Sequence, residues 1–288
     1  MSRLALTLRL LALAATFAVI APPHYLAMRM LGRRSGGAPV LFHRAFLWLF
    51  SVRVSQSGTP PAPGEPALVL ANHVSWLDII AIGSLRPLSF VAKSEIAGWP
   101  VIGILAGLQR TLFIDRGRRG ATATVSQQMG HRLSQGELVV LFAEGTTGDG
   151  TRLLPFRSSL VGAARAALQG ESENGRVRLQ PLAITYPRRN GLPVARSERP
   201  DIAWYGDMDL APHLAAFVKG GPIDAHIVWG TPIPFEAGTD RKAATAAAEA
   251  EVRRTIQSVV GGRSAVVEGR ASAPADAGLG EVGDLSAA

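Results

Sequence analysis

Cysteine is absent from all 288 residues of the chain. Its absence excludes disulfide bonds, zinc sites with thiolate ligands and a cysteine nucleophile. It leaves the cellular compartment open, because cytosolic proteins can also lack cysteine. The length suits one sizeable α/β domain, or a domain with appendages.

Acidic residues are missing from the first sixty positions, and Glu65 is the first one. The same segment holds seven arginines, at positions 3, 9, 29, 33, 34, 44 and 53. Because the whole chain has 30 basic residues, the remainder carries 23 basic against 22 acidic side chains. The net charge of +8 therefore lies almost wholly in an apolar N-terminal segment, which suits an anionic membrane surface. Nucleic-acid binding is disfavoured, because these arginines alternate with Leu, Phe and Trp.

A long uncharged apolar run is also lacking in the N-terminal segment. The stretch 4–23 predicts a helix ended by Pro22 and Pro23. Its longest uncharged run, Leu10–Ala21, is shorter than the roughly 20 residues that span a bilayer, although the helix could just span with Leu4–Leu8 included. A cleaved signal peptide is a third interpretation, but a small-residue cleavage pattern is not evident after Ala21.

The next segments lead into the expected globular domain. Residues 40–54 mix aromatic residues with arginine, which fits a helix in the lipid headgroup layer. A helix and strand packed into the core are the alternative. We predict membrane-associating helices over residues 1–56 and a Pro/Gly-rich linker over residues 57–66.

From residue 67 onward, apolar β-rich runs alternate with helical patterns. The apolar runs are 67–71, 88–92, 111–114, 138–142, 180–186 and 225–229, and the helical patterns are 76–85, 121–134, 158–168 and 208–218. The alternation predicts an α/β fold with a largely parallel central sheet flanked by helices. An Ala-rich helical run, 239–260, completes a predicted domain over 67–260, and the tail 261–288 is predicted to be disordered.

The stretch LANHVSWLDII, residues 70–80, places His73 and Asp78 where a predicted strand meets a predicted helix. In one interpretation Ser75 caps a helix that begins at Trp76, and Asp78 completes a capping box. In the other, Asp78 orients His73 and makes it a general base for a hydroxyl, at the sheet edge where α/β proteins bind ligands. The spacing by itself favours the cap.

Three further motifs carry polar residues near strand ends. LVVLFAEGTTGDG, residues 138–150, runs from a strand into Glu144, where a carboxylate could accept a hydrogen bond from a substrate hydroxyl; an ordinary polar turn is the alternative. LQRTLFIDRGRRG, residues 108–120, places Arg116 after a strand, where it could bind phosphate or carboxylate. In QPLAITY, residues 180–186, Pro181 suits an edge or substrate-facing strand.

Together these segments resemble the phospholipid/glycerol acyltransferase family, often called 1-acylglycerol-3-phosphate acyltransferases. Members show His-x4-Asp, Phe-Ile-x-Arg, Phe-Pro-Glu-Gly-Thr and a Pro-containing apolar strand. This chain has HVSWLD, FIDR, FAEGT and QPLAIT in that order, over about Pro66–Tyr186. Each motif alone is weak, but four in one order are a strong indication.

The resemblance implies that His73 is the general base on the acceptor hydroxyl and that Asp78 orients it. It implies that the residues holding the lysolipid acceptor are Arg116, Glu144, Gly145 and Thr146, with Arg157 as a further cation. The implied donor is an acyl thioester of coenzyme A or acyl carrier protein, with no metal and no bound cofactor. The N-terminal helices would lie on the cytoplasmic face of the inner membrane. Backbone N–H groups of residues 72–76 are expected to bind the oxyanion.

Two departures from the family pattern bear on the acceptor. Ala143 stands where the family usually has Pro, and Thr147 stands where phosphate-acceptor members usually have Arg. The missing arginine weakens the case for a phosphate headgroup. EGTTGDG with WYGDMDLAPHL, residues 204–214, is similar to members that acylate lyso-ornithine lipid, although the second stretch also fits a structural turn and helix. Lysophosphatidate stays open as the acceptor.

Two other classes of protein are weaker alternatives. A serine hydrolase would use the same His and Asp, but the chain lacks Gly-x-Ser-x-Gly. A non-catalytic membrane-associated lipid-binding protein would explain the N-terminal segment alone.

Overall fold

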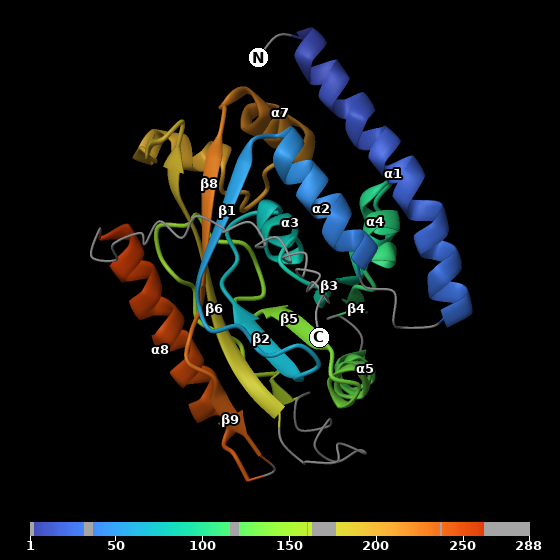
Figure 1. Ribbon diagram of the computed structural model, residues 1–288. Helices are drawn as coiled ribbons and strands as arrows, with labels where there is room; N and C mark the ends of the chain where they lie inside the picture. Colours follow the sequence, from blue (N-terminus) through green and yellow to red (C-terminus); the bar gives the residue numbers. More distant parts are fainter. Residues whose placement is uncertain are drawn as a thin grey trace, which may run out of the picture.

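The computed structural model describes residues 3–31, 37–115, 121–159, 161–162, 177–236 and 238–261. Within these residues a nine-stranded sheet lies at the centre, with helices on both faces (Figure 1). The strands are β1 Val52–Gly58, β2 Ala67–Ala71, β3 Ser89–Lys93, β4 Leu112–Ile114, β5 Leu138–Phe142, β6 Val177–Arg189, β7 Leu192–Pro193, β8 Ile223–Trp229 and β9 Ile233–Phe235. The helices are α1 Arg3–Leu31, α2 Gly37–Leu49, α3 Leu77–Gly83, α4 Ile102–Leu108, α5 Ala121–Ser134, α7 Leu210–Lys219 and α8 Arg241–Val260, with short 3-10 helices η2 Ser94–Gly98 and η3 Arg196–Asp201.

The sheet is largely parallel, as the sequence predicts. Its strand order is β1-β8-β6-β2-β5-β3-β4, and β7 and β9 pair with β6. The pairs β1–β8, β2–β5, β2–β6, β3–β4 and β3–β5 are parallel, whereas β6 runs antiparallel to β7, β8 and β9. Every residue of the central strands β2 and β5 is buried, because helices cover both faces.

Alternate residues of β2 belong to two hydrophobic cores, one on each face of the sheet. Leu68 and Leu70 pack on the side of α5 and α8, whereas Ala67 and Val69 pack on the side of α2, α3 and α7. This is the period of two that a strand imposes on its side chains. Both faces of the sheet are therefore anchored, and the carboxyl ends of its strands are held in fixed positions.

Helix α1 does not end at Pro22 and Pro23, so that prediction was wrong. The prolines remove two amide donors from the helix, but contacts on either side of them hold one continuous helix. Phe17 packs edge-on against Phe42, and the His24 ring lies 3.0 Å from the Leu108 carbonyl oxygen. The stretch Leu4–Met30 spans 27 residues, and an 18-residue window within it has a mean hydropathy of 2.2 and holds no buried residue, so by length and composition it could cross a membrane.

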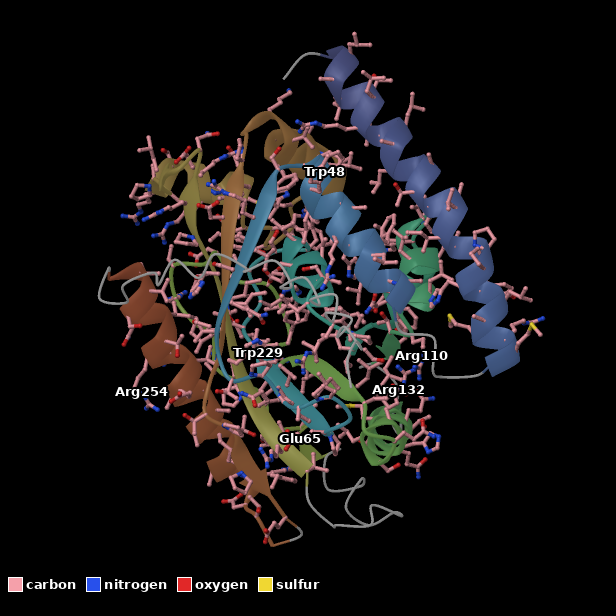
Figure 2. The ribbon with its side chains drawn as sticks, in the orientation of Figure 1. Trp48, Glu65, Arg110, Arg132, Trp229 and Arg254 are labelled. Carbon is pink, nitrogen blue, oxygen red and sulfur yellow. The ribbon has the colours of Figure 1, made fainter. Side chains whose placement is uncertain are left out.

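Residues 40–54 form a core helix and strand, which decides between the two interpretations of this segment. Phe46 and Phe50 are buried in the core, and Val52 begins β1, which pairs with β8. Trp48 is the exception: it is 80% exposed and projects from α2 (Figure 2). The sheet therefore begins at Val52, and the boundary predicted after residue 56 falls within β1.

Pro181 lies in the central strand β6, not at an edge as predicted. Its carbonyl accepts a hydrogen bond from the Gly230 amide at 2.9 Å. Gly230 belongs to the connection between β8 and β9, where one antiparallel partner of β6 ends and the next has not begun. Proline is tolerated because its nitrogen faces this side, where no residue of β8 or β9 pairs with it; its partner on the other side is Leu70 of β2.

Two other predicted segments need comment. Residues 204–214 form a turn followed by the start of α7, which is the structural alternative for WYGDMDLAPHL. The helix predicted over residues 158–168 and the tail 262–288 fall mostly outside the described residues.

Candidate active site

Three strands bring the candidate site together at one edge of the sheet. β2 lies between β5 and β6 and is parallel to both, so the turns after β2 and β5 meet beside the distal half of β6. The Asn72 side chain fixes this junction: it donates to the Ile184 carbonyl at 3.0 Å and accepts from the Ile184 amide at 2.8 Å. The carboxyl edge of a parallel sheet is the usual ligand-binding edge of an α/β protein.

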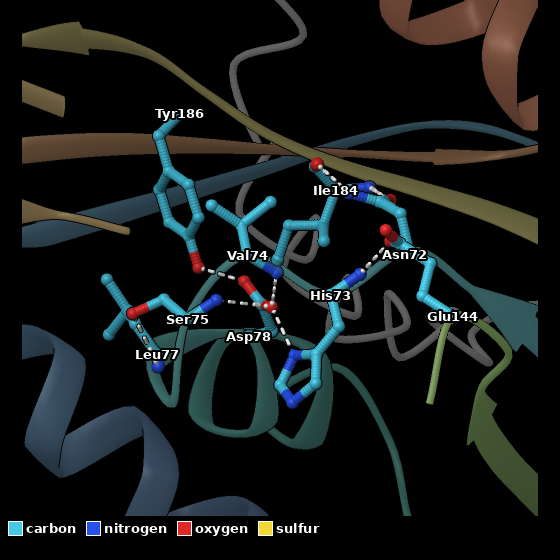
Figure 3. Close-up of polar contacts among 9 residues, drawn as sticks. All are labelled: Asn72, His73, Val74, Ser75, Leu77, Asp78, Glu144, Ile184 and Tyr186. Carbon is cyan, nitrogen blue, oxygen red and sulfur yellow. Dashed lines mark hydrogen bonds and ion pairs between the residues drawn. The ribbon is translucent and has the colours of Figure 1, made fainter. Parts of the chain in front are cut away.

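His73 and Asp78 form the predicted pair. His73 Nδ1 lies 2.8 Å from Asp78 Oδ2, and the Asp78 side chain is fully buried (Figure 3). A carboxylate can only accept, so Nδ1 carries the hydrogen and Nε2 keeps its lone pair. Within the described part of the chain, no group makes a hydrogen bond to Nε2. This tautomer is the one that a general base requires.

Asp78 also holds the turn in which His73 lies. Its Oδ2 accepts from the backbone amides of Val74 at 2.6 Å and Ser75 at 2.9 Å, and its Oδ1 accepts from the Tyr186 hydroxyl at 2.6 Å (Figure 3). One carboxylate thus binds the turn amides and orients the imidazole, but the predicted cap by Ser75 was wrong, because the helix N-cap makes no side-chain hydrogen bond. The helix begins at Leu77, one residue later than predicted, with Trp76 at its N-cap position.

The backbone amides at residues 73–75 do not fit the expected oxyanion role. The His73 amide donates to Glu144 Oε1 at 2.7 Å, and the next two amides donate to Asp78. Because each N–H is already used, an oxyanion would have to displace a carboxylate to reach it. Ser75 is fully buried, so the serine-hydrolase alternative has no accessible nucleophile there.

One face of the His73 ring packs against a stack of two phenylalanine rings. It lies parallel to Phe142, with ring centroids 3.8 Å apart and an interplanar angle of 11°, and Phe142 stacks in turn on Phe90. The His73 side chain is 16% exposed. The ring is thus held on one face by β5 and at Nδ1 by Asp78, and only its Nε2 side remains open.

Glu144 lies directly after β5 and ties two loops together. Its Oε1 accepts from the His73 amide at 2.7 Å, and its Oε2 accepts from the Leu154 amide at 2.9 Å. Burial raises the pKa of Glu144 to about 7. The two hydrogen bonds from the backbone amides lower this pKa, whereas the negative charges of Asp78 and Glu249 raise it further. The contact of Glu144 with His73 is through the backbone, so Glu144 positions the histidine loop.

A cavity of about 450 Å³ opens beside His73 and Glu144. Apolar residues of the cavity wall include Val74, Leu153, Ile202 and, at the end of α8, Ile256, Val259 and Val260. Charged residues of the wall are Asp149, Arg152, Arg188 and Arg199. A cavity with one apolar part and one charged part suits an amphipathic ligand.

The other predicted site residues are less closely placed. Gly145 has a positive φ of +75°, which glycine adopts without strain. Thr146 and Arg157 are exposed and do not line the cavity, so their contact with the acceptor stays a prediction. Arg116 lies outside the described residues. Among the residues described, no cluster of three or more potential metal ligands occurs.

Sequence reasoning missed Tyr186 and the arginines of the cavity. Tyr186 belongs to the quoted motif QPLAITY, but only the folded sheet shows that its hydroxyl reaches Asp78, 108 residues away. Residues 184–188 all line the cavity, because a bulge between Thr185 and Arg188 interrupts the alternation of β6. A strict strand pattern would have sent every second one of these side chains to the other face.

The fold and the site together define an α/β protein with a carboxylate-supported histidine beside an amphipathic cavity. The family model named Acyltransferase matches residues 51–185. The chain is similar to the lyso-ornithine lipid O-acyltransferases of Brucella abortus, at 42% identity over 84% of this chain and 90% of that one, and of Pseudomonas aeruginosa, at 38% identity over 72% of each. A 1-acyl-sn-glycerol-3-phosphate acyltransferase of Neisseria gonorrhoeae is 42% identical over 36% of this chain and 42% of that one.

A solved structure shares the fold. The 1-acyl-sn-glycerophosphate acyltransferase of Thermotoga maritima superimposes with a TM-score of 0.55 at 19% identity, covering 88% of this chain and 97% of that one. The chain belongs to the acyltransferase family, whose relatives here are lysolipid O-acyltransferases, and it is an enzyme of this class. The resemblance carried by the four motifs is thereby confirmed, and the exposed apolar α1 fits an enzyme associated with membrane lipid.

Proposed function

We propose that the enzyme acylates the hydroxyl of lyso-ornithine lipid during membrane-lipid biosynthesis. Two observations support this acceptor over lysophosphatidate. Relatives that match most of the chain carry the lyso-ornithine name, whereas the Neisseria glycerophosphate relative matches 36% of it. Thr147 also replaces the arginine expected in phosphate-acceptor members.

In the proposed mechanism His73 activates the acceptor. The lysolipid hydroxyl binds in the cavity with its hydrogen directed at Nε2, and the imidazole removes the proton as the oxygen attacks the thioester carbonyl carbon. The imidazole becomes an imidazolium, and the buried Asp78 carboxylate stabilises this charge at Nδ1. The tetrahedral intermediate then reforms its C=O bond and expels the thiolate. The proton held by His73 passes to the thiolate, which restores the neutral base.

The remaining roles complete the proposal. The donor is an acyl thioester of acyl carrier protein or coenzyme A, used at the cytoplasmic face of the inner membrane. Glu144 and Gly145 shape the acceptor loop, and Arg116, Thr146 and Arg157 contribute from its outer side. Helix α1 supplies membrane attachment, and the catalytic domain extends to residue 260.

The free Nε2 of His73, backed by a buried carboxylate at 2.8 Å, carries the proposal. We expect His73→Ala to lower turnover by roughly two to four orders of magnitude, the usual contribution of a general base. The assay uses the full chain with an acyl thioester and lyso-ornithine lipid, and follows thiol release together with the acylated lipid by mass spectrometry. The matched control is His131→Ala, an exposed histidine on α5.

Two outcomes would contradict separate parts of this proposal. Near-normal turnover by His73→Ala would exclude the histidine as the base. Product formation from lysophosphatidate but none from lyso-ornithine lipid would exclude the proposed acceptor and leave the mechanism intact.

A further inference from the structure

Three arginines line the cavity without an intramolecular anion. Arg152 follows β5, Arg188 lies in β6 and Arg199 lies in η3. Over the described ranges of the chain, none of their guanidinium groups forms an ion pair or a hydrogen bond to a side chain. Arg189, the neighbour of Arg188, is by contrast buried and binds Asp201 at 2.8 Å. Unpaired guanidinium groups gathered on one concave wall are a binding site for an anion.

A carboxylate on the same wall supplies the opposite charge. Asp149 accepts from the Thr151 amide at 2.9 Å and from its hydroxyl at 2.6 Å, and these hydrogen bonds lower the pKa of Asp149, so it is ionised at neutral pH. The charge of Arg152 acts on Asp149 in the same direction. Arg152 is thereby partly neutralised, which leaves Arg188 and Arg199 as the stronger anion site.

The backbone around these two arginines is fixed. The Arg199 carbonyl accepts from the amides of Ile202 and Ala203, at 3.0 and 2.8 Å, and both of these residues line the cavity. Arg188 follows the bulge in β6 and is paired with Asp224 and Pro193 in the strand register. The two guanidinium groups therefore project from rigid elements, which favours recognition of a defined group over loose attraction of counterions.

We propose that Arg188 and Arg199 bind the carboxylate of the ornithine headgroup, and that Asp149 binds its side-chain ammonium group. Ornithine with its α-amine acylated carries one carboxylate and one ammonium, and the cavity offers the complementary charges beside His73. This assignment rests on the proposed acceptor, lyso-ornithine lipid. It also explains how the headgroup is held although Thr147 replaces an arginine.

The test compares charged and neutral headgroups on the full-length enzyme. The acceptors are lyso-ornithine lipid, its carboxyl methyl ester, and its side-chain N-acetyl derivative. For the wild type we expect the KM to rise about tenfold on either modification, since each removes one charge-assisted contact. For R188Q/R199Q the acid and its ester should have nearly equal KM values, with kcat within about twofold of the wild type. D149N should instead remove the discrimination against the N-acetyl derivative.

The matched control is R196Q, because Arg196 lies in η3 with Arg199 but is exposed outside the cavity. Discrimination between acid and ester that persists in R188Q/R199Q overturns the assignment. A raised KM for the thioester donor, with the acceptor KM unchanged, also overturns it and assigns the anion site to the donor. Wild-type enzyme that does not acylate lyso-ornithine lipid at all contradicts the proposed function itself, and the headgroup assignment falls with it.

Discussion

At the scale of single residues, the Asp78 carboxylate organises the site. It accepts from the His73 ring, from the amides of Val74 and Ser75, and from the Tyr186 hydroxyl. These four donors come from the turn after β2 and from β6. A fully buried carboxylate needs such partners to remain charged. The same partners also prevent its rotation, so the direction of the histidine ring is fixed before any substrate binds.

Tyr186→Phe tests this support while leaving His73 and Asp78 in place. The variant removes one donor from Asp78 and keeps the aromatic ring. A hydrogen bond to a charged group is typically worth about 1.5–3 kcal/mol, so we expect kcat to fall roughly tenfold or more. The KM for both substrates should hardly change, and the pH profile of kcat should shift because the partner of His73 is altered.

The control for this variant is Tyr205→Phe, since no hydrogen bond of the Tyr205 hydroxyl is present in the described structure. Equal kcat values and superimposable pH profiles for Tyr186→Phe and wild type would show that the tyrosine only fills space.

Glu144 predicts a pH dependence of stability. Burial raises its folded pKa from 4.5 to about 7, so between these values the folded protein holds a proton that the unfolded chain has released. Protonated Glu144 therefore favours the folded state at low pH. As the pH rises from about 4.5 to about 7, the free energy of unfolding should fall by roughly 3 kcal/mol in total. Glu144→Gln, which cannot ionise, should lack this loss. Chemical unfolding of both proteins in detergent across this range measures the difference.

The exposed Glu95→Gln is the matched control and should follow the wild-type curve. If the free energies of unfolding of wild type and Glu144→Gln change in parallel between pH 4.5 and 7, folding does not raise the pKa of Glu144.

Local sequence predicts only part of this site. His73, Asp78 and Glu144 stand in short motifs at strand ends, and the parallel order of β2 and β5 is enough to bring them together. Tyr186 and the cavity arginines could not be found in that way. Their position depends on a bulge in β6 and on η3, and neither the bulge nor the path of η3 has a local pattern of its own.

At the scale of elements, the contact of α2 with α3 is close. A Cβ atom at Gly83 would lie 2.3 Å from His43 Nδ1. The His43 ring is buried, and burial lowers its pKa to about 4, so it is neutral at physiological pH. The absence of a side chain at Gly83 therefore sets the distance between the two helices that support the histidine turn.

Gly83→Ala should lower the free energy of unfolding by about 1–3 kcal/mol, the usual cost of overpacking a core. Gly107→Ala is the control, because Gly107 lies in α4 with open space around its Cα. It should be neutral or stabilise by about 0.5–1 kcal/mol through helix propensity. Thermal unfolding of both variants compares them directly. An unchanged Gly83→Ala would mean that His43 can move aside without loss.

Elements with clear periodicity were predictable, and those fixed by distant contacts were not. β2, β5 and α5 have the predicted bounds. Helix α1 continues through its prolines because Phe42 and the Leu108 carbonyl, far along the chain, hold both halves. For β1 the sequence left a strand over the end of 40–54 as one of two interpretations, because VRVSQSG is polar and its pairing with β8 lies far along the chain.

At the scale of the whole molecule, α1 lies along the outside of α2 and α4 (Figure 1), and it carries exposed apolar side chains. Leu8 is 56% and Leu11 61% exposed. We expect Leu8→Glu with Leu11→Glu to reduce association with lipid vesicles at least roughly tenfold, since each carboxylate is strongly disfavoured in hydrocarbon. Flotation of the full chain with anionic vesicles measures this.

Leu192→Glu is the matched control, because Leu192 is 70% exposed but lies on β7, away from the N-terminal helices. It should bind vesicles like the wild type. An equal loss for both variants would mean that apolar exposure anywhere on the surface drives association.

The short join between α2 and β1 has a consequence for how the enzyme meets its lipids. Only Phe50 and Ser51 separate the helix from a strand that belongs to the catalytic sheet. Such a join cannot act as a swinging arm. Helix α2 therefore moves with the catalytic sheet as one body, and a lipid that reaches the cavity meets an imidazole whose orientation relative to α2 is fixed.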